Sequence, residues 1–261
     1  MNQQAHSDGT VGKALEVLEK VADFGRPVRF SELLADSAHP KATLYRLLQT
    51  LTNQRMLAYD ESRQTYAPGL RLVRMAHTAW KQSSLAPVAR PFIDALAAKS
   101  GEAVHLAQLD NGHVLFVDKR KTTDLFETLA QTGKIAPSYC TGVGKAILAF
   151  MPEADRDRAL SQQAFLHYTP STHTNVETLS DELQEVRRDG VAFDRQEHEQ
   201  GIISIAAPIL YSNQRVVGAV SIATAIPRRS LNDLEKMKPE LLETAAKIAA
   251  AAEIWHFPTQ I

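Results

Sequence analysis

The chain of 261 residues is short of cysteine, of long apolar runs and of net charge of either sign. Its one cysteine, Cys140, excludes an internal disulfide and suits a reducing cytoplasm, where we expect the protein to work. No apolar run approaches the roughly 20 residues that a membrane helix needs, so no membrane partner is expected. The polar start, residues 1–10, lacks the apolar core of a secretion signal and is expected to be a frayed tail.

The formal net charge of −1 excludes a general attraction to polyanions, so any nucleic-acid binding must come from a local basic surface. Residues 1–80 hold ten Lys and Arg against eight Asp and Glu, a balance of +2, which leaves −3 for the remainder. The asymmetry is mild, and its sign favours the N-terminal part as the nucleic-acid-binding part.

Residues 28–68 carry the most informative pattern in the sequence. The predicted segments are, in order, a helix over 28–34, a polar turn over 36–40, a helix over 41–51, and β-prone runs over 56–60 and 65–67. This order of helix, turn, helix and wing is typical of a module that places a helix in the major groove of DNA and a β-ribbon beside it.

The helix over 41–51 has two faces. Its leucines recur at helical spacing and should pack on the first helix: Leu44, Leu47, Leu48 and Leu51. The other face is polar and starts after Pro40, a residue that suits a helix N-terminus, where phosphate is favoured. The expected DNA contacts are Lys41 and Thr43 to phosphate, Tyr45, Arg46 and Gln49 to base edges, and Arg63 from the wing. An ordinary amphipathic helix with a solvated face is the alternative, and the flanking helix and wing argue against it.

Three parts are expected along the chain: a DNA-binding domain over 1–69, a connecting helix over 70–83, and an α/β domain over 84–261. The first part opens with an amphipathic helix over 11–24. In the last part we expect helices over 87–99, 142–150, from 153, over 176–189 and over 231–255, and strands over 103–109, 113–119, 202–210 and 216–225. Asp110-Asn111-Gly112 is a strong hairpin signal between the first two of these strands.

A candidate small-molecule site can be assembled in the α/β domain. Gly142 and Val143 open a helix, where free backbone amides can meet an anion. Asp194 lies just before an apolar strand, and Ser204 and Ser221 interrupt two apolar strands, so these polar groups need partners. Together they would suit a small hydroxy or oxo acid, with the amides on its carboxylate. A tight turn at the glycines and serines paired with backbone remain the alternatives.

Evidence for catalysis or metal binding is weak. Cys140 could serve as a nucleophile with a histidine, but no motif fixes the pair, and a buried core cysteine is the more common case. The histidines at 105, 113, 167, 173 and 198 show no zinc-ligand spacing, so neither a metal nor a cofactor is expected. Glu197 and Glu199 beside His198 are interpreted as a solvated loop or a salt-bridge cluster.

The sequence resembles the IclR family of bacterial transcriptional regulators over nearly its whole length. The resemblance rests on the order and spacing of Pro40-Lys41-Ala42-Thr43-Leu44-Tyr45-Arg46-Leu47-Leu48, Tyr66-Ala67-Pro68-Gly69, Ser100-Gly101-Glu102, residues 141–149, residues 194–197 and residues 201–208. It implies an α+β protein in which an N-terminal winged helix-turn-helix is joined by a helix to a GAF-like α/β effector domain. By position, it also implies an effector site at Gly142, Val143, Asp194, Ser204 and Ser221.

The resemblance further implies dimers, often paired into tetramers, that bind double-stranded palindromic operators and respond to small organic acids. Residues 140–145 look most like members that control sugar-acid catabolism, so a sugar acid or keto acid is the expected effector. The sequence departs from the family at Ala42, where serine is common, and at Arg55, where glycine usually turns into the wing and a different turn shape is expected. Ser204 replaces a cysteine of some members, and Ala223 replaces a second serine.

The leading prediction is a cytoplasmic repressor of a catabolic operon, gated by a small organic acid, and not an enzyme. One alternative is a constitutive DNA-binding oligomer whose C-terminal domain only assembles. The other is a GAF-type enzyme that uses Cys140. An ionised Asp194 would accept hydrogen bonds only, which favours a ligand with hydroxyl donors over a compact diacid.

Overall fold

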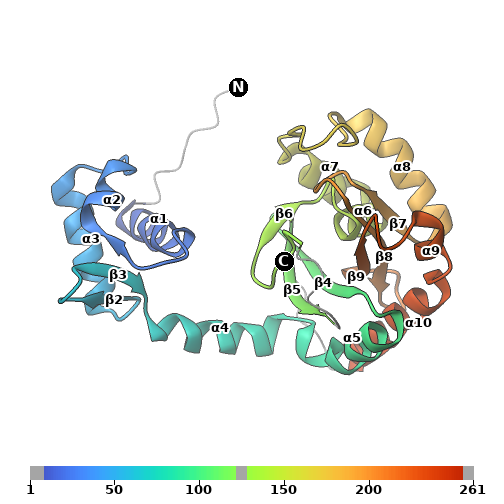
Figure 1. Cartoon of the computed structure of the whole chain (residues 1–261), viewed down its shortest axis with the longest axis horizontal. Helices are drawn as coiled ribbons and strands as arrows, with labels where there is room; N and C mark the ends of the chain where they lie inside the picture. Colours follow the sequence, from blue (N-terminus) through green and yellow to red (C-terminus); the bar gives the residue numbers. More distant parts are fainter. Residues whose placement is uncertain (1–8, 122–127, 255–261) are drawn as a thin grey trace. The chain divides into compact units, whose positions relative to one another are not determined.

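A computed structural model describes residues 9–121 and 128–254, which form two compact units that divide between Lys81 and Gln82 (Figure 1). The expected tail over 1–10 lies outside the described residues except for Gly9 and Thr10, which already belong to the first helix. Each unit has a core of its own, and helix α4 (Leu70–Ser83) carries the chain from one unit into the other. None of the helices in the described ranges is long and apolar enough to cross a membrane.

Unit 1 contains the predicted order of helix, turn, helix and wing. Its elements are α1 (Gly9–Asp23), β1 (Val28–Arg29), α2 (Phe30–Ala35), α3 (Lys41–Asn53), β2 (Leu57–Asp60) and β3 (Thr65–Pro68), with an antiparallel sheet of order β1-β3-β2. The helix predicted from residue 28 begins only at Phe30, because Val28 and Arg29 pair with Tyr66 and Thr65 of β3.

The leucine face of α3 is buried, as the periodicity predicts. Its neighbours are α1 and β2 as well as α2, and Val17 and Val21 of α1 belong to the same core as Leu44 and Leu48. The predicted packing on α2 is confirmed, and α1 and β2 cover the rest of this face because α2 is only six residues long. The opposite face of α3 is therefore left free at the surface.

The turn from α3 into the wing keeps the backbone conformation that glycine favours, although Arg55 occupies it. Arg55 has a φ of 58°, in the left-handed region that disfavours residues with a Cβ. Two backbone bonds fix the turn: Met56 N donates to Leu51 O at 2.9 Å, and Gly69 N donates to Met56 O at 2.8 Å. Whatever its shape in relatives, this turn places a residue with a Cβ in the left-handed region.

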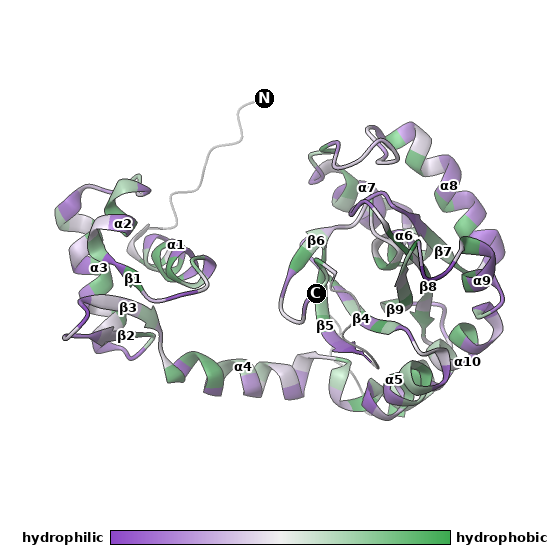
Figure 2. Ribbon diagram, in the orientation of Figure 1, coloured by the Kyte–Doolittle hydropathy of each residue, from purple (hydrophilic) through white to green (hydrophobic). Residues whose placement is uncertain are grey.

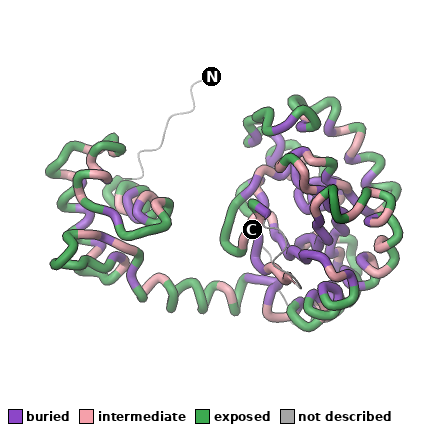
Figure 3. The backbone as a smooth tube through the Cα atoms, in the orientation of Figure 1, coloured by how far each residue is buried: buried purple, intermediate pink, exposed green. Residues whose placement is uncertain are grey.

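Helix α4 is amphipathic but has no buried residue. Its apolar side chains Leu70 and Val73 are 86% and 65% exposed. Figure 2 shows hydrophobic segments along α4, and Figure 3 shows most of this helix as exposed. Val11 and Leu15 of α1 are exposed as well. Among the described residues, these apolar side chains of α1 and α4 are thus exposed in a single chain.

Unit 2 is a six-stranded antiparallel sheet of order β6-β5-β4-β9-β8-β7 with helices on both faces (Figure 1). Its elements are α5 (Ala86–Ser100), β4 (Ala103–Asp110), β5 (His113–Arg120), β6 (Ile135–Pro137), α6 (Gly142–Phe150), α7 (Glu153–Ser161), α8 (Val176–Asp189), β7 (Ala192–Arg195), β8 (Ile202–Leu210), β9 (Val216–Ala225), α9 (Leu231–Glu235) and α10 (Lys238–Ile254).

Successive side chains of a strand point to opposite faces of the sheet, so the buried residues divide into two sets. Ala107, Ala206 and Ala219 point into the core formed with α6 and α8, while their neighbours Ala207 and Val220 are buried outside that cluster. Helices α5 and α10 pack on the same strands and cover the second face. The hairpin predicted at Asp110-Asn111-Gly112 is confirmed, with positive φ at both Asn111 and Gly112. The chain has an α+β fold.

Two details of unit 2 differ from the sequence prediction. The C-terminal helix predicted over 231–255 is two helices, α9 and α10, with a break at Lys236 and Met237. Pro239 explains the break, because it has no amide to donate to the preceding turn and its ring collides with a continuing helix. Residue 255 lies outside the described residues. Strand β6 was not predicted, since three residues carry too little periodicity.

Candidate nucleic-acid interface and small-molecule site

The polar face of α3 is accessible. Lys41, Tyr45, Arg46 and Gln49 are exposed, and Thr43 is half-buried. The Gln49 side-chain amide donates to Tyr45 Oη at 2.9 Å, and the Tyr45 ring meets Phe30 of α2 edge-on, with ring centroids 6.1 Å apart. These contacts orient Tyr45 and Gln49 together on one side of the helix.

A surface hollow of about 810 Å³ adjoins the first turns of α3 and the wing. It is lined by Arg29, Phe30, Ser31, Lys41, Ala42, Tyr45, Tyr59, Gln64 and Tyr66. Of the six DNA-contact candidates, Lys41 and Tyr45 line it, whereas Thr43, Arg46, Gln49 and Arg63 do not. The sequence does not indicate Arg29, Tyr59 and Tyr66 as part of this surface, because it predicts helix from residue 28 and does not reveal the pairing of β1 with the wing.

The tip of the wing is held by one carboxylate. Asp60 Oδ1 accepts from Ser62 N at 2.9 Å, Ser62 Oγ at 2.7 Å and Arg63 N at 3.1 Å. The Arg63 side chain extends from this turn and is 78% exposed. The wing therefore presents a cation beside the hollow.

In unit 2, the sheet register brings the polar strand residues together on the α6 face. Asp194 of β7 lies opposite Ser204 of β8, which lies opposite Ala223 of β9. In a neighbouring row, Ser221 of β9 lies opposite Ala206 of β8 and His105 of β4. Because side chains alternate between faces, these residues share the side of the sheet that α6 covers.

The N-terminus of α6 faces these rows. Thr141 caps the helix by accepting from Gly144 N at 3.3 Å. Within the described ranges no acceptor is found for the amides of Gly142 and Val143. A Cβ on Gly142 would lie 2.8 Å from Ser204 Oγ, which shows how closely the helix approaches β8. Two free amides and the helix dipole make this end suited to an anion.

A pocket of about 40 Å³ lies at this junction, and all five predicted effector-site residues line it: Gly142, Val143, Asp194, Ser204 and Ser221. Its other lining residues are His105, Phe116, Thr128, Ala130, Thr141, His198, Glu199, Ile202 and Ala223. His105 was missed, although its place at the centre of an apolar strand was a usable signal. The space is far below the roughly 300–1,000 Å³ of a typical ligand pocket. An organic acid would have to enlarge it.

Two buried groups set the electrostatics of the pocket. Burial and the nearby Glu197 carboxylate raise the pKa of Asp194 to about 7, although Lys145 opposes the shift. Burial, with the charges of Lys119 and Lys121, lowers the pKa of His105 to about 3, so this imidazole is neutral. The raised pKa brings the protonated form of Asp194, which can donate a hydrogen bond, closer to neutral pH. The preference for hydroxyl donors over compact diacids applies to the ionised form, and it stays a prediction.

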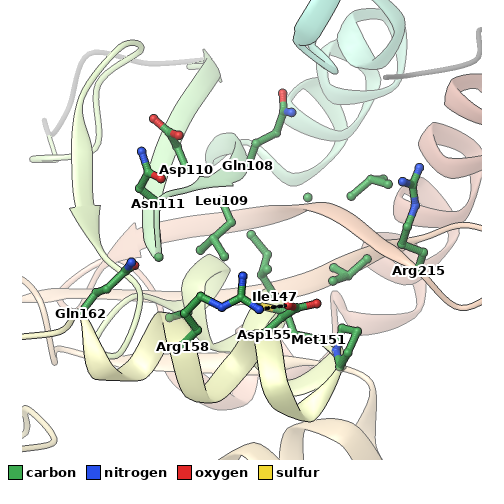
Figure 4. A pocket seen from close by; sticks show the side chains of 16 residues that line it. Gln108, Leu109, Asp110, Asn111, Ile147, Met151, Asp155, Arg158, Gln162 and Arg215 are labelled. Carbon is green, nitrogen blue, oxygen red and sulfur yellow. Dashed lines mark hydrogen bonds and ion pairs between the residues drawn. The ribbon is translucent and has the colours of Figure 1, made fainter. Parts of the chain in front are cut away.

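A larger groove of about 620 Å³ lies elsewhere on unit 2, between the β4–β5 turn, α7 and the start of β9 (Figure 4). Arg158 and Arg215 come from different elements along it, and Leu109, Ile147 and Met151 form apolar parts of its lining. Arg158 is already paired with Asp155 at 3.0 Å. None of the predicted site residues lines this groove. The larger cavity and the predicted effector site therefore lie in different places. We favour the small pocket, because free amides and buried polar side chains converge only there within the described ranges.

Cys140 gives no support to an enzyme. The residue is fully buried, and burial together with the nearby Asp194 and Glu197 raises the pKa of its thiol far above neutral pH. A protonated, inaccessible thiol is a core residue and not a nucleophile.

Comparisons with known proteins agree with this architecture. Residues 10–61 match the IclR helix-turn-helix domain, and residues 77–250 match the bacterial transcriptional regulator IclR C-terminal domain. The chain is 26% identical over 236 residues to the probable transcriptional regulator SauR of Cupriavidus necator, covering 90% of this chain and 94% of that protein. It is also 26% identical over 241 residues to the transcriptional repressor IclR of Escherichia coli, covering 92% of this chain and 88% of the repressor.

A solved structure shares the fold: an IclR homologue from Microbacterium hydrocarbonoxydans, in complex with 4-hydroxybenzoate, superposes with a TM-score of 0.80 at 22% identity over 94% of this chain and all of that one. The two family matches follow each other along the chain in the order of units 1 and 2. The chain therefore belongs to the IclR family of bacterial transcriptional regulators and is a DNA-binding regulator, not an enzyme.

Proposed function

We propose that this regulator represses a catabolic operon, and that a small organic acid bound at the N-terminus of α6 modulates its binding to operator DNA. The observation that carries the proposal is the convergence of Asp194, Ser204 and Ser221 on the two free amides of Gly142 and Val143. Repression is supported by the E. coli relative, which is a transcriptional repressor. A protein that binds an operator acts where bacterial DNA lies, in the cytoplasm.

For the DNA contacts, α3 would enter the major groove. Lys41 and Thr43 sit in its first turn, where amides and the helix dipole favour phosphate, and Tyr45, Arg46 and Gln49 follow on the polar face. Arg63 would reach the backbone from the wing. The exposure of these side chains and the adjacent hollow support this placement.

Replacing Arg46 by Ala is expected to cost about 1–3 kcal/mol of binding to the specific operator and to relax sequence preference at one position. Replacing Lys41 by Ala should weaken binding to all DNA about equally and flatten its salt dependence, because a phosphate contact releases counterions without reading sequence. Fluorescence anisotropy over a salt series separates the two effects. Lys247→Ala, at an exposed position of α10, is the charge control. Unchanged operator affinity in Arg46→Ala would contradict the placement.

For the effector, the amides of Gly142 and Val143 would hold a carboxylate, and Ser204, Ser221, His105 and Asp194 would meet hydroxyl or carbonyl groups. A sugar acid or keto acid fits this set of partners. The homologue that was solved with 4-hydroxybenzoate supports a small acid as the ligand class. Asp194 can accept from a ligand hydroxyl when ionised and donate to a carbonyl when protonated, and its raised pKa favours the second form, so the pocket would serve both kinds of acid.

Calorimetry with hydroxy, keto and aromatic acids is expected to find one ligand that also weakens or strengthens operator binding. Asp194→Ala and Ser221→Ala should each reduce its affinity about tenfold, by roughly the value of one hydrogen bond to a charged group, while operator binding without ligand stays intact. Arg215→Ala, in the groove of Figure 4, should leave the affinity unchanged. If Arg215→Ala loses the ligand and the two pocket variants keep it, the effector site is the groove.

Self-association is proposed from the uncovered apolar surface of α4 and α1. Leu70, Val73 and Val11 are exposed in the single chain, which favours a partner of the same kind. A dimer would also read two operator half-sites about one helical turn apart. Light scattering at micromolar concentration should give a dimer or tetramer, and Val73→Glu should lower the mass while Lys247→Glu should not. A monomeric wild-type protein would contradict the proposal.

A constitutive DNA-binding oligomer is the second candidate, because the pocket of about 40 Å³ is far smaller than the roughly 300–1,000 Å³ of a typical ligand site. If operator binding is tight and no acid in the panel binds or changes it, this candidate holds.

A further inference from the structure

Three side chains that the effector pocket does not use come together behind it. His173 precedes α8, Glu182 lies on α8, and Glu197 lies in the loop between β7 and β8. His173 Nε2 and one oxygen of each carboxylate all lie within 4.8 Å of one another. None of the three lines the pocket at the N-terminus of α6.

The carboxylates of Glu182 and Glu197 each turn one oxygen toward Lys145 and the other toward His173. Lys145 Nζ binds Oε1 of both, at 2.8 Å for Glu182 and 2.5 Å for Glu197. Arg195 also binds Glu182 Oε1, at 2.8 Å. The second oxygens turn toward His173: Glu182 Oε2 lies 2.6 Å and Glu197 Oε2 lies 4.0 Å from Nε2.

Glu197 Oε2 is the atom of this cluster whose surroundings point to a missing partner. The residue is 2% exposed, and this oxygen has no hydrogen-bond partner among the described residues. A buried carboxylate oxygen without a partner is costly, and such an oxygen in a folded protein calls for an explanation. On this side it faces the His173 ring, whose Nε2 at 4.0 Å is too distant for a hydrogen bond.

The other face of His173 orients the ring. His173 Nδ1 lies 3.1 Å from Thr178 Oγ1, and that hydroxyl lies 3.1 Å from Asn175 Oδ1. The single hydroxyl hydrogen can go to Asn175, which leaves Thr178 Oγ1 to accept from Nδ1–H. On its other side Nε2 faces two carboxylate oxygens, and a cation held between the three atoms would give Glu197 Oε2 a partner. A hydrogen-bonded Nδ1 is also the usual support of a metal-binding imidazole.

We propose that His173 Nε2, Glu182 Oε2 and Glu197 Oε2 bind a divalent transition-metal cation of the zinc type, with one position left for a further ligand. One imidazole and two carboxylates are ligands that zinc accepts, at about 2.0–2.2 Å each. Ligand atoms at such bonds are about 3.3 Å apart in a tetrahedron. Glu182 and His173 need to separate slightly and Glu197 to approach, and the partial exposure of the first two leaves an entry path.

Charge limits the affinity of this site. Lys145 and Arg195 already neutralise much of the two carboxylates. Binding is therefore expected to be weaker than in a closed site of thiolates. The same cation would restrain the segment from Asp194 to Glu199, because Glu197 N donates to Asp194 Oδ1 at 2.7 Å and Arg195 N donates to Glu197 Oε1 at 3.2 Å. The expectation of no metal site came from chain spacing, which does not reveal ligands brought together from three separate segments of the fold.

Titration of chelator-treated full-length protein with Zn²⁺ tests the proposal, with Co²⁺ as a spectroscopic substitute. We expect one site per chain, intense Co²⁺ visible bands, and at least about tenfold weaker binding in both His173→Ala and Glu182→Gln. Thr178→Val should weaken binding as well, by loosening the ring. His167→Ala, an exposed histidine in the same unit, is the control and should bind as the wild type does.

The proposal is overturned if wild type and His173→Ala bind Zn²⁺ equally, or if His167→Ala loses the site. A wild-type protein that binds no Zn²⁺ overturns it as well. Glu182→Gln keeps the size of the side chain and His173→Ala removes a partly exposed ring, so melting curves of both variants should show a folded protein. The outcome is independent of DNA and organic-acid binding, and it leaves the proposed function untouched.

Discussion

Replacing Lys145 by Met is expected to destabilise unit 2 by about 3–5 kcal/mol, the largest stability effect we expect from a single substitution in this chain. The Lys145 side chain is fully buried, and its ammonium group contacts Glu182 and Glu197. Without it, the buried Glu197 carboxylate loses its ammonium partner, while Glu182 keeps its contacts with Arg195 and His173. The loss is a large fraction of the roughly 5–15 kcal/mol that stabilises a domain.

Chemical denaturation that follows unit 2 measures this effect. Lys247→Met is the matched control, because Lys247 is exposed and its pair with Glu243 should contribute less than about 1 kcal/mol. Combining Lys145→Met with Glu197→Gln should recover part of the loss, because the amide no longer carries a charge that needs a partner. A cost below about 1 kcal/mol for Lys145→Met would mean that water reaches the carboxylates and that the site is not closed.

The sequence predicted the elements of both units well, because their patterns are local. The leucine spacing of α3, the Asn111-Gly112 turn and the glycine-rich start of α6 each determine structure within a few residues. The break between α9 and α10 also has a local signal, Pro239. The long Ala- and Leu-rich run predicts one continuous helix, but the proline interrupts it.

The candidate pocket could be predicted only in part. Asp194, Ser204 and Ser221 are conspicuous as polar residues beside or within apolar strands. Their meeting depends on the pairing of β7, β8 and β9, a property of the sheet that family resemblance supplied and single-sequence periodicity does not. His105 shares a row with Ser221 through β4, and its polar ring inside an apolar strand was the one signal that could have added it to the set.

Charged residues were the hardest to interpret. Lys145 follows a Gly-Val-Gly segment and would be expected at the surface, yet it is buried. Glu197 was interpreted as part of a solvated loop or a salt-bridge cluster, and only the second interpretation is right. Burial of a charge depends on partners far away in sequence, and these are visible only in the folded chain.

The second large effect concerns Asp194, where Asp194→Asn is expected to stabilise unit 2 at alkaline pH. Burial and Glu197 raise the pKa of this carboxyl to about 7, from an unfolded value of about 4. The folded protein therefore binds more protons than the unfolded chain between these values, and stability falls as pH rises through this window. At about pH 8 the penalty is nearly complete, on the order of 4 kcal/mol for a difference of this size.

Asparagine keeps the shape of the side chain and can still accept from Glu197 N through its carbonyl oxygen. It removes only the buried negative charge, so Asp194→Asn should melt higher than wild type at about pH 8 and match it near pH 4. Asp181→Asn, on the exposed side of α8, is the control and should shift stability little at any pH. The test is the melting temperature of the three proteins across this pH range. If the difference in melting temperature between Asp194→Asn and wild type does not widen with pH, the pKa of Asp194 is not raised. A gap that widens would mean that the pocket keeps a destabilising carboxylate, which is what a site retained for ligand binding at the cost of stability would do.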